Sequence, residues 1–395
     1  MARIAASYLY TLVSPEPLRN AWVEYNDDGV ISGVGLCDDV SREDTFIEGA
    51  VVPGFVNAHC HVELSYMWKL FRRGTGMTGF IDQINELRDT KPLEEKVADI
   101  RFRMDRMWES GISAMADISN CSDSFAVKAS SPMYTRTFLE VFGTEKEDCP
   151  AIISDVLRLK EEAEIFALDA APTPHACYTM SPELVTASSA EALKSGFLSY
   201  HSEETPEEEE MLISGSGPMY ENRVRAGMST PPVTGKSSLL YFIDRLKKVH
   251  PAPFREHILL VHEVCMNQEG IDAVKEAMEN PFIALCPKSN IYIHNTLPPV
   301  DLMRRSGIRL AVGTDSLSSN DDLDMVSELF CLQENFPHIP LGELFTWACR
   351  GGAGFLGKED TLGTVEEGKR PGLVAVDHIG PDGRLTTASR SRRIV

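Results

Sequence analysis

VVPGFVNAHCHVE, residues 51–63, joins a strand-like apolar run to two closely spaced histidines. The first nine residues are almost wholly apolar, which is typical of a strand that is covered on both faces. Alternate side chains of a strand point to the same side, so His59 and His61 are expected to face one way and Cys60 the other. Two imidazoles on one side can bind Zn²⁺ or a similar divalent ion together.

Seven further apolar runs follow this one, with helical stretches such as 93–111 and 237–249 between them. Strands that alternate with helices predict an α/β fold, here a (β/α)8 TIM-like barrel. An open doubly wound sheet is the alternative, but no G-x-G-x-x-G motif opens a helix. The seven runs are ISAMADIS (112–119), YTRTFLEVFG (134–143), IFALDAAPTPHA (165–176), FLSYHSEE (197–204), ILLVHEV (258–264), FIALCPKS (282–289) and RLAVGTDS (309–316).

The two ends of the chain are expected to build a second, smaller unit. AWVEY, NDDG and VISGVG, over residues 21–35, have the pattern of a hairpin, because Asn, Asp and Gly supply the turn between β-rich runs. GLVAVDHI (372–379) is another strand-like run near the other end. We therefore predict a small β-sandwich domain from residues 1–53 and 362–395, and the barrel from residues 54–361.

Composition limits the partners and the compartment of the protein. The 395 residues carry a net charge of −21, which argues against nonspecific binding to nucleic acid or to an anionic membrane. No stretch approaches the roughly 18 apolar residues of a spanning helix. The nine cysteines are scattered without a C-x-x-C pair, as in a reduced protein. We expect a cytoplasmic protein with a small-molecule substrate, and we leave assembly into a homo-oligomer open.

Side chains that can bind a metal follow four of the apolar runs. His59 and His61 follow the first run, His201 the fifth, His262 the sixth and Asp315 the eighth. The carboxyl ends of the strands in a parallel barrel meet at its catalytic face. The sequence therefore predicts a metal site at that face.

Acidic residues after the fifth run are candidates for proton transfer. Glu204 lies three residues after His201, where the strand gives way to a helix. A carboxylate there can take a proton from a metal-activated water and return it. Glu203 competes for this role, but the spacing favours Glu204. The acidic run from Glu207 to Glu210 is expected to be a solvated helix face.

Taken together, these stretches resemble the amidohydrolase superfamily, whose first-strand signature is similar to PGFVNAHCHVELS (53–65). The later motifs follow in the order of the branch that contains guanine, adenosine-type and S-adenosylhomocysteine deaminases and the triazine chlorohydrolases. HVELS (61–65) and GTDSLSSN (313–320) resemble the aminodeoxyfutalosine deaminases in particular. The motifs are TPHACYTMSPEL (173–184), HSEETPEEEEM (201–211), LLVHEVCMNQEGI (259–271), LCPKSNIYI (285–293), LAVGTDSLSSNDDLDMVSEL (310–329) and GTVEEGKRPGLVAVD (363–377).

The resemblance implies a metal ligand set and a metal count. In that branch the ligands correspond to His59, His61, His201 and Asp315. Members with two metals bridge them with a carboxylated lysine on the fourth strand, and FALDAAPTPHA (166–176) holds no lysine. We therefore expect one divalent metal, with Zn²⁺ first and Fe or Mn as alternatives.

The resemblance also implies roles for residues around the metal. Glu204 would transfer the proton, while His262 and Asp315 would orient the attacking water and complete the catalytic set. His175, in the P-H-x-x-Y motif, would reach the substrate. We expect Glu63 and Ser289 to contact the substrate as well.

The activity that the resemblance implies is hydrolytic deamination of an aminated purine-type base or nucleoside, with aminodeoxyfutalosine as the leading candidate. A chlorohydrolase or a cyclic-amide hydrolase would use the same site, so these activities remain alternatives. A noncatalytic scaffold is also conceivable, because a fold does not determine a function. The retention of every ligand type together with Glu204 argues against it.

Overall fold

The computed structural model describes residues 1–38, 45–88 and 90–395, so residues 39–44 of the predicted small β domain lie outside the described part. Each of the eight predicted apolar runs overlaps a strand, although the first is divided, because residues 51–53 end β4 (Phe46–Pro53) of another sheet and β5 begins at Phe55. The eight strands from β5 to β12 form two four-stranded parallel sheets, in the orders β5-β6-β7-β8 and β12-β11-β10-β9. The strands are β5 (Phe55–Cys60), β6 (Ile112–Ser119), β7 (Tyr134–Val141), β8 (Asp169–Pro174), β9 (Phe197–Ser202), β10 (Phe254–His262), β11 (Met278–Leu285) and β12 (Arg309–Val312).

The two sheets meet along two seams. At the first, the backbone amides of Thr314 and Asp315 donate to the carbonyl oxygen of His59, at 3.1 and 3.0 Å. At the second, the amide of His201 donates to the carbonyl of His175 at 3.0 Å. Gly313 permits the close approach at the first seam, because a Cβ at this position would lie 2.8 Å from the Cβ of His59.

At least one helix follows each of these strands. Helices α2 and α8 confirm the two helical stretches expected from the sequence. The helices are α1 (Gly76–Leu87), α2 (Leu93–Glu109), α3 (Phe125–Ser130), α4 (Cys149–Ile165), α5 (Pro182–Lys194), α6 (Pro206–Ser214), α7 (Gly217–Ala226), α8 (Ser238–Leu246), α9 (Gln268–Ala277), α10 (Pro287–His294), α11 (Val300–Ser306), α12 (Met325–Asn335), α13 (Leu341–Thr346) and α14 (Gly352–Phe355).

Alternate residues of the strands pack into two separate apolar clusters. In β10, Ile258 and Leu260 join the large cluster that includes the surrounding helices, whereas Leu259 and Val261 join a second cluster of strand side chains. This alternation follows from the period of two in a strand. The strands are therefore covered by apolar side chains on both faces.

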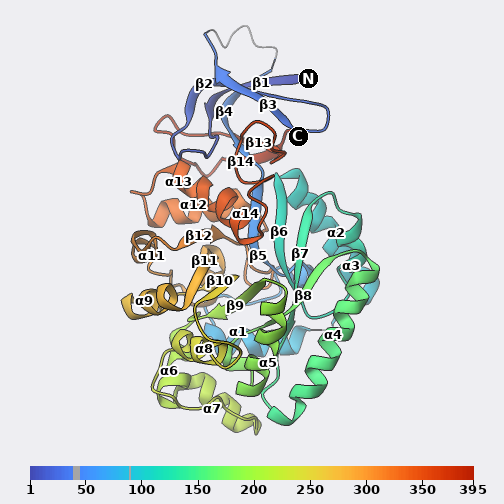
Figure 1. Cartoon of the computed structure of the whole chain (residues 1–395), viewed down its shortest axis with the longest axis vertical. Helices are drawn as coiled ribbons and strands as arrows, with labels where there is room; N and C mark the ends of the chain where they lie inside the picture. Colours follow the sequence, from blue (N-terminus) through green and yellow to red (C-terminus); the bar gives the residue numbers. More distant parts are fainter. Residues whose placement is uncertain (39–44, 89) are drawn as a thin grey trace.

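The two ends of the chain share a six-stranded sheet of order β14-β13-β4-β1-β2-β3. It lies at one end of the molecule, and both termini are found there (Figure 1). The described strands form one sheet, so the structure supports a small β unit from both chain ends and does not confirm the two layers of a sandwich. The strands are β1 (Ala2–Leu9), β2 (Leu18–Tyr25), β3 (Ile31–Leu36), β4 (Phe46–Pro53), β13 (Leu373–Asp377) and β14 (Arg390–Arg393).

The predicted hairpin is present as the antiparallel pair of β2 and β3. Its turn uses the Asn26 side chain, whose Oδ1 accepts hydrogen bonds from the amides of Asp28 and Val30. In the described part of the chain, no helix is both long enough and apolar enough to cross a membrane. All nine cysteines are free thiols.

Candidate active site

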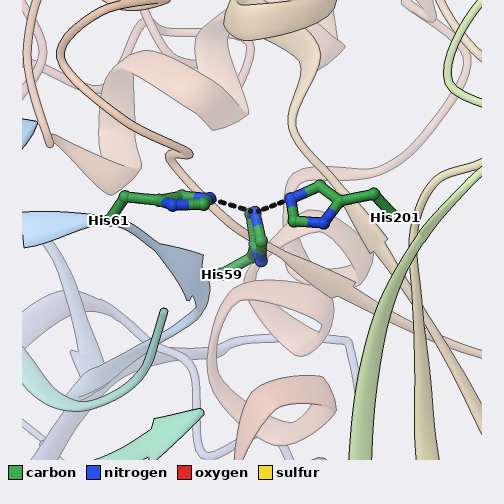
Figure 2. A group of neighbouring side chains, drawn as sticks. All are labelled: His59, His61 and His201. Atoms are coloured by element: carbon green, nitrogen blue, oxygen red, sulfur yellow. Dashed lines mark hydrogen bonds between the residues drawn. The ribbon is translucent and has the colours of Figure 1, made fainter. Parts of the chain in front are cut away.

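Three imidazoles converge where β5 and β9 end. The Nε2 atom of His59 lies 3.1 Å from Nε2 of His61 and 3.2 Å from Nε2 of His201 (Figure 2). All three side chains are buried. Cys60, between the two first histidines, instead belongs to the apolar cluster shared with the helices, as the alternation of side chains predicts.

Asp315 adds a carboxylate to this group. Its Oδ1 lies 3.6 Å from Nε2 of His59 and 3.4 Å from Nε2 of His61. Its other oxygen accepts hydrogen bonds from the hydroxyls of Ser289 and Ser319, at 2.6 and 2.8 Å. The backbone of Asp315 has φ 56°, a left-handed conformation that is uncommon outside glycine and is often found at functional sites.

The chemistry of this donor set fits a divalent metal. Burial, together with the neighbouring imidazoles, lowers the pKa of His61 to about 3 and that of His201 well below its usual value. These rings are therefore neutral, and neutral imidazoles offer nitrogen lone pairs. Lone pairs that face one another within 3.1–3.2 Å need a shared cation or proton between them. Three imidazoles and a carboxylate are ligands that Zn²⁺ accepts in proteins.

Glu204 and His262 form a second group beside the imidazoles. Oε1 of Glu204 lies 3.3 Å from Nε2 of His262, and Oε2 accepts a hydrogen bond of 2.8 Å from the hydroxyl of Tyr178. The other nitrogen of His262, Nδ1, lies 3.1 Å from the side-chain amide of Asn290. Burial and the nearby Asp315 raise the pKa of Glu204 to about 8, so this carboxyl group can exchange a proton near neutral pH.

The structure separates Glu204 from its rival Glu203. Glu204 lines the cavity that contains the imidazoles, whereas Glu203 does not. Glu203 has φ 47°, a left-handed conformation that is uncommon outside glycine. The backbone amide of Glu203 donates to the hydroxyl of Ser238, on the side of α8.

The cavity encloses about 800 Å³ of empty space, which includes a part open to solvent. His175 lines it, and its Nδ1 lies 2.8 Å from the Thr179 hydroxyl. Contact between His175 and the substrate stays a prediction. His61, His201, His262 and Asp315 line the same cavity.

Glu63 and Ser289 lie outside this cavity. Ser289 is fully buried behind Asp315 and donates to it. Glu63 accepts hydrogen bonds from the amides of Asn120 and Cys121, at 2.9 and 3.4 Å. Substrate contacts by Glu63 and Ser289 therefore stay a prediction, and their positions favour supporting roles.

Sequence reasoning missed several residues that hold the site together. Tyr178 was visible in the P-H-x-x-Y motif, but its contact with Glu204 was not expected. Glu140, at the end of β7, places Oε1 3.4 Å from Nδ1 of His201. The hydrogen-bond partner of this nitrogen is the carbonyl oxygen of His175, at 3.3 Å, and a carbonyl in this position fixes the orientation of a metal-binding imidazole. Like Glu204, Glu140 is an acidic residue near the end of an apolar run, and this position could have indicated it. It was not singled out because it belongs to no recognised motif.

The acidic run after Glu204 is not the solvated helix face that we expected: Glu210 is exposed, but the prediction is wrong for Glu207, Glu208 and Glu209. Glu207 accepts hydrogen bonds from the backbone amides of Met77 and Thr78, at 3.2 and 3.0 Å, and these bonds anchor the first turn of α1. Glu208 is fully buried and accepts the amide of Glu204 at 2.8 Å. Free amides at a helix start attract carboxylates, so the run serves as a set of local acceptors.

Comparison with known proteins identifies the family. Residues 50–395 match the Amidohydrolase family, which is most of the chain. The chain belongs to this family. The resemblance noted from its motifs is therefore confirmed, as is its assignment to the hydrolases of this family.

Two curated relatives of this amidohydrolase are deaminases of adenosine compounds. The chain is 27% identical over 338 residues to an adenosine deaminase of Helicobacter pylori, and the match covers 83% of this chain and 79% of the relative. It is 26% identical over 378 residues to a 5-methylthioadenosine/S-adenosylhomocysteine deaminase of Halobacterium salinarum, covering 90% and 79%.

A solved structure shows the same fold over the full length. The aminofutalosine deaminase of Helicobacter pylori, in complex with methylthio-coformycin, superposes with a TM-score of 0.80 and 23% identity. The superposition covers 100% of both chains. The mixed α/β fold of this amidohydrolase is therefore shared from end to end.

Proposed function

We propose that this amidohydrolase is a metal-dependent hydrolytic deaminase of an aminated purine-type base or nucleoside. The observation that carries the proposal is the pairing of Glu204 and His262 beside a group of three buried imidazoles, two of which, His61 and His201, line the same cavity as this pair. Ammonia loss from an aromatic ring needs both an activated water and a group that moves protons. The named relatives, which are deaminases of adenosine compounds, support the same chemistry.

His59, His61, His201 and Asp315 would hold one divalent metal, for which Zn²⁺ suits the three imidazoles best, with Fe or Mn as alternatives. Such a metal, when bound, supplies a nucleophile from water at neutral pH. Ser289 and Ser319 fix the carboxylate of Asp315, and Glu140 faces the far nitrogen of His201. These contacts hold the ligands in place before substrate arrives.

The protein's own groups move the protons. Glu204 takes the proton of the attacking water at a carboxylate oxygen and delivers it to the ring nitrogen next to the carbon under attack. It then delivers the second proton to the departing amine. Tyr178 holds one Glu204 oxygen, which leaves the other directed towards His262. His262 orients the nucleophile and stabilises negative charge on the adduct.

For the wider architecture, we propose that the two parallel sheets are halves of one closed (β/α)8 barrel spanning residues 54–361. The hydrogen bonds at the two seams support closure. Residues 1–53 and 362–395 would form the small β domain, since β13 pairs with β4.

Aminodeoxyfutalosine is our leading candidate substrate, supported by the fold shared with the aminofutalosine deaminase. Adenosine and 5′-methylthioadenosine follow from the curated relatives. Chloride release or the opening of a cyclic amide remains the alternative, because the same metal and carboxylate would serve it.

The test is a screen of aminated and chlorinated heterocycles with the purified, zinc-loaded protein. Ammonia and chloride are measured separately, and the metal content is measured by elemental analysis. We expect ammonia from at least one adenine nucleoside and about one metal per chain. Chloride or amide products without ammonia from any aminated ring would replace deamination by the alternative.

A further inference from the structure

One face of α1 forms a wall of the catalytic cavity. Met77, Phe80, Ile81 and Ile84 line the cavity, and Arg88 follows at the end of the helix. These positions are spaced by three or four residues, which puts them on one side of a helix. The wall is therefore apolar from Met77 to Ile84, and Asn85 and Arg88 add an amide and a positive charge at its end.

Arg88 is a cation whose guanidinium has no hydrogen-bond or salt-bridge partner among the described residues. It is the only lysine or arginine among the described residues that line the cavity. Within the described ranges, its guanidinium makes no hydrogen bond and no ion pair, and its Cζ lies 5.4 Å from the centroid of the Phe142 ring. Only its backbone amide is used, donating to the Ile84 carbonyl at 2.8 Å.

The acidic residues of the cavity are engaged elsewhere. Glu140 accepts a hydrogen bond from the side chain of Asn120 at 3.2 Å, and Glu204 accepts one from Tyr178. Asp315 faces the imidazoles and is held by its serines. None of these carboxylates forms a salt bridge with Arg88, although the charge of Arg88 acts at longer range on Glu140. Its guanidinium donors are therefore available to a ligand.

Space continues beyond Arg88. A second cavity, with about 910 Å³ of empty space that includes open solvent, adjoins the first. The two cavities share Leu64, Arg88, Asn120 and Phe142. Arg88 therefore stands at their junction, at the opposite end of the α1 wall from Met77.

We infer that Arg88 binds a carboxylate at the end of an apolar extension of the substrate, and that the extension lies along α1. The apolar side chains of α1 offer dispersion contact and no hydrogen bonds, which suits an uncharged stem. A guanidinium offers two parallel donors that match the two oxygens of a carboxylate. This inference rests on the proposed deaminase function and narrows its substrate to a nucleoside with an acidic, extended substituent.

The test compares two ligands and two variants. The ligands are aminodeoxyfutalosine, which ends in a carboxylate, and its methyl ester, which removes that charge. The variants are Arg88→Gln and, as a matched control, Arg101→Gln. Arg101 lies on α2, where it donates to the Ser130 hydroxyl, and it does not line the cavity.

Arg88→Gln should lower kcat/KM for the carboxylate by roughly 10- to 100-fold, the usual range for one hydrogen bond to a charged group. The kcat/KM of Arg88→Gln for the ester should change little. Arg101→Gln should leave kcat/KM for both ligands unchanged, and Arg88→Lys should recover part of the loss for the acid. An equal loss for the acid and the ester would overturn the inference, because Arg88 would then act on the site in general. A preference for adenosine over every acidic nucleoside would overturn it as well.

Equilibrium binding of the same two ligands to Glu204→Gln gives a readout that does not depend on turnover. Arg88→Gln is also added to the Glu204→Gln protein. If the wild-type protein releases no ammonia but Arg88→Gln in this background weakens binding of the acid and not of the ester, the deaminase proposal fails and the Arg88 site stands. If ammonia is released and the acid binds no better than its ester, the Arg88 site fails and the deaminase proposal stands.

Discussion

Glu204→Gln separates proton transfer from metal binding. Glutamine keeps the size of the side chain and can still accept the hydrogen bond from Tyr178, which measures 2.8 Å in the wild type. It cannot take a proton, so the path from water to the leaving amine is interrupted. A positioned acid–base group contributes about 10²- to 10⁴-fold, and we expect kcat to fall by at least that factor.

Metal content provides the internal comparison. Glu204 lies beside His262 and outside the group formed by His59, His61 and His201, so the variant should keep its metal. His61→Ala removes a ligand and should lose metal and activity together. Ammonia release and elemental analysis on the same samples distinguish the two outcomes.

The pH profile adds a second readout. Because burial beside Asp315 raises the pKa of Glu204, its ionised form is lost as the pH falls through that value. The wild-type kcat/KM should therefore decline on the acidic side, and this limb should be absent from the residual activity of Glu204→Gln.

Glu203→Gln is the matched control, since the two glutamates are adjacent and both are buried. It should be much milder, because Glu203 does not line the cavity. If Glu203→Gln abolished turnover while Glu204→Gln retained most of it, the proton carrier would be the other carboxylate. If neither mattered, the deaminase mechanism would have to be abandoned.

Two further predictions concern the supports of the site. Ser289→Ala removes one donor to Asp315 and should weaken metal retention against a chelator by roughly 10- to 100-fold, whereas Ser188→Ala, which loses only a bond within its own helix, should not. Equal metal loss from both variants would contradict this. Lys128→Met should destabilise the fold by about 3–5 kcal/mol, seen as a lower urea midpoint, because Lys128 pairs with Asp117 and both are fully buried. An unchanged midpoint would show that the pair contributes nothing.

The sequence predicted the positions of strands and strand ends because that information is local. The apolar runs are continuous, and a polar residue at the end of each run marks where the chain leaves the sheet. His61, His201, His262 and Asp315 could be placed together from this rule alone, and the structure brings them together in one cavity, with His59 directly beside His61 and His201.

Contacts between distant segments could not be predicted in the same way. Glu207 has its partners in α1, about 130 residues earlier in the chain, and nothing near Glu207 indicates them. A run of four acidic residues reads as solvated unless its acceptor role is known. Glu140 faces His201 only because β7 and β9 lie close in space, and it therefore escaped notice. The arrangement of the terminal strands also depends on pairing between distant segments, and pairing leaves little trace in composition.

The separation of α1 from the metal ligands has a consequence for how this enzyme can change. The metal ligands, Glu204 and His262 come from the ends of β5, β9, β10 and β12, whereas one wall of the cavity comes from the twelve-residue helix α1 and the Arg88 that follows it. Substitutions at Phe80, Ile81, Ile84 or Arg88 can therefore alter which molecules fit without touching the chemistry. Successive substitutions in this short segment can therefore change the substrate stepwise. Each intermediate protein would keep its metal ligands and its catalytic carboxylate.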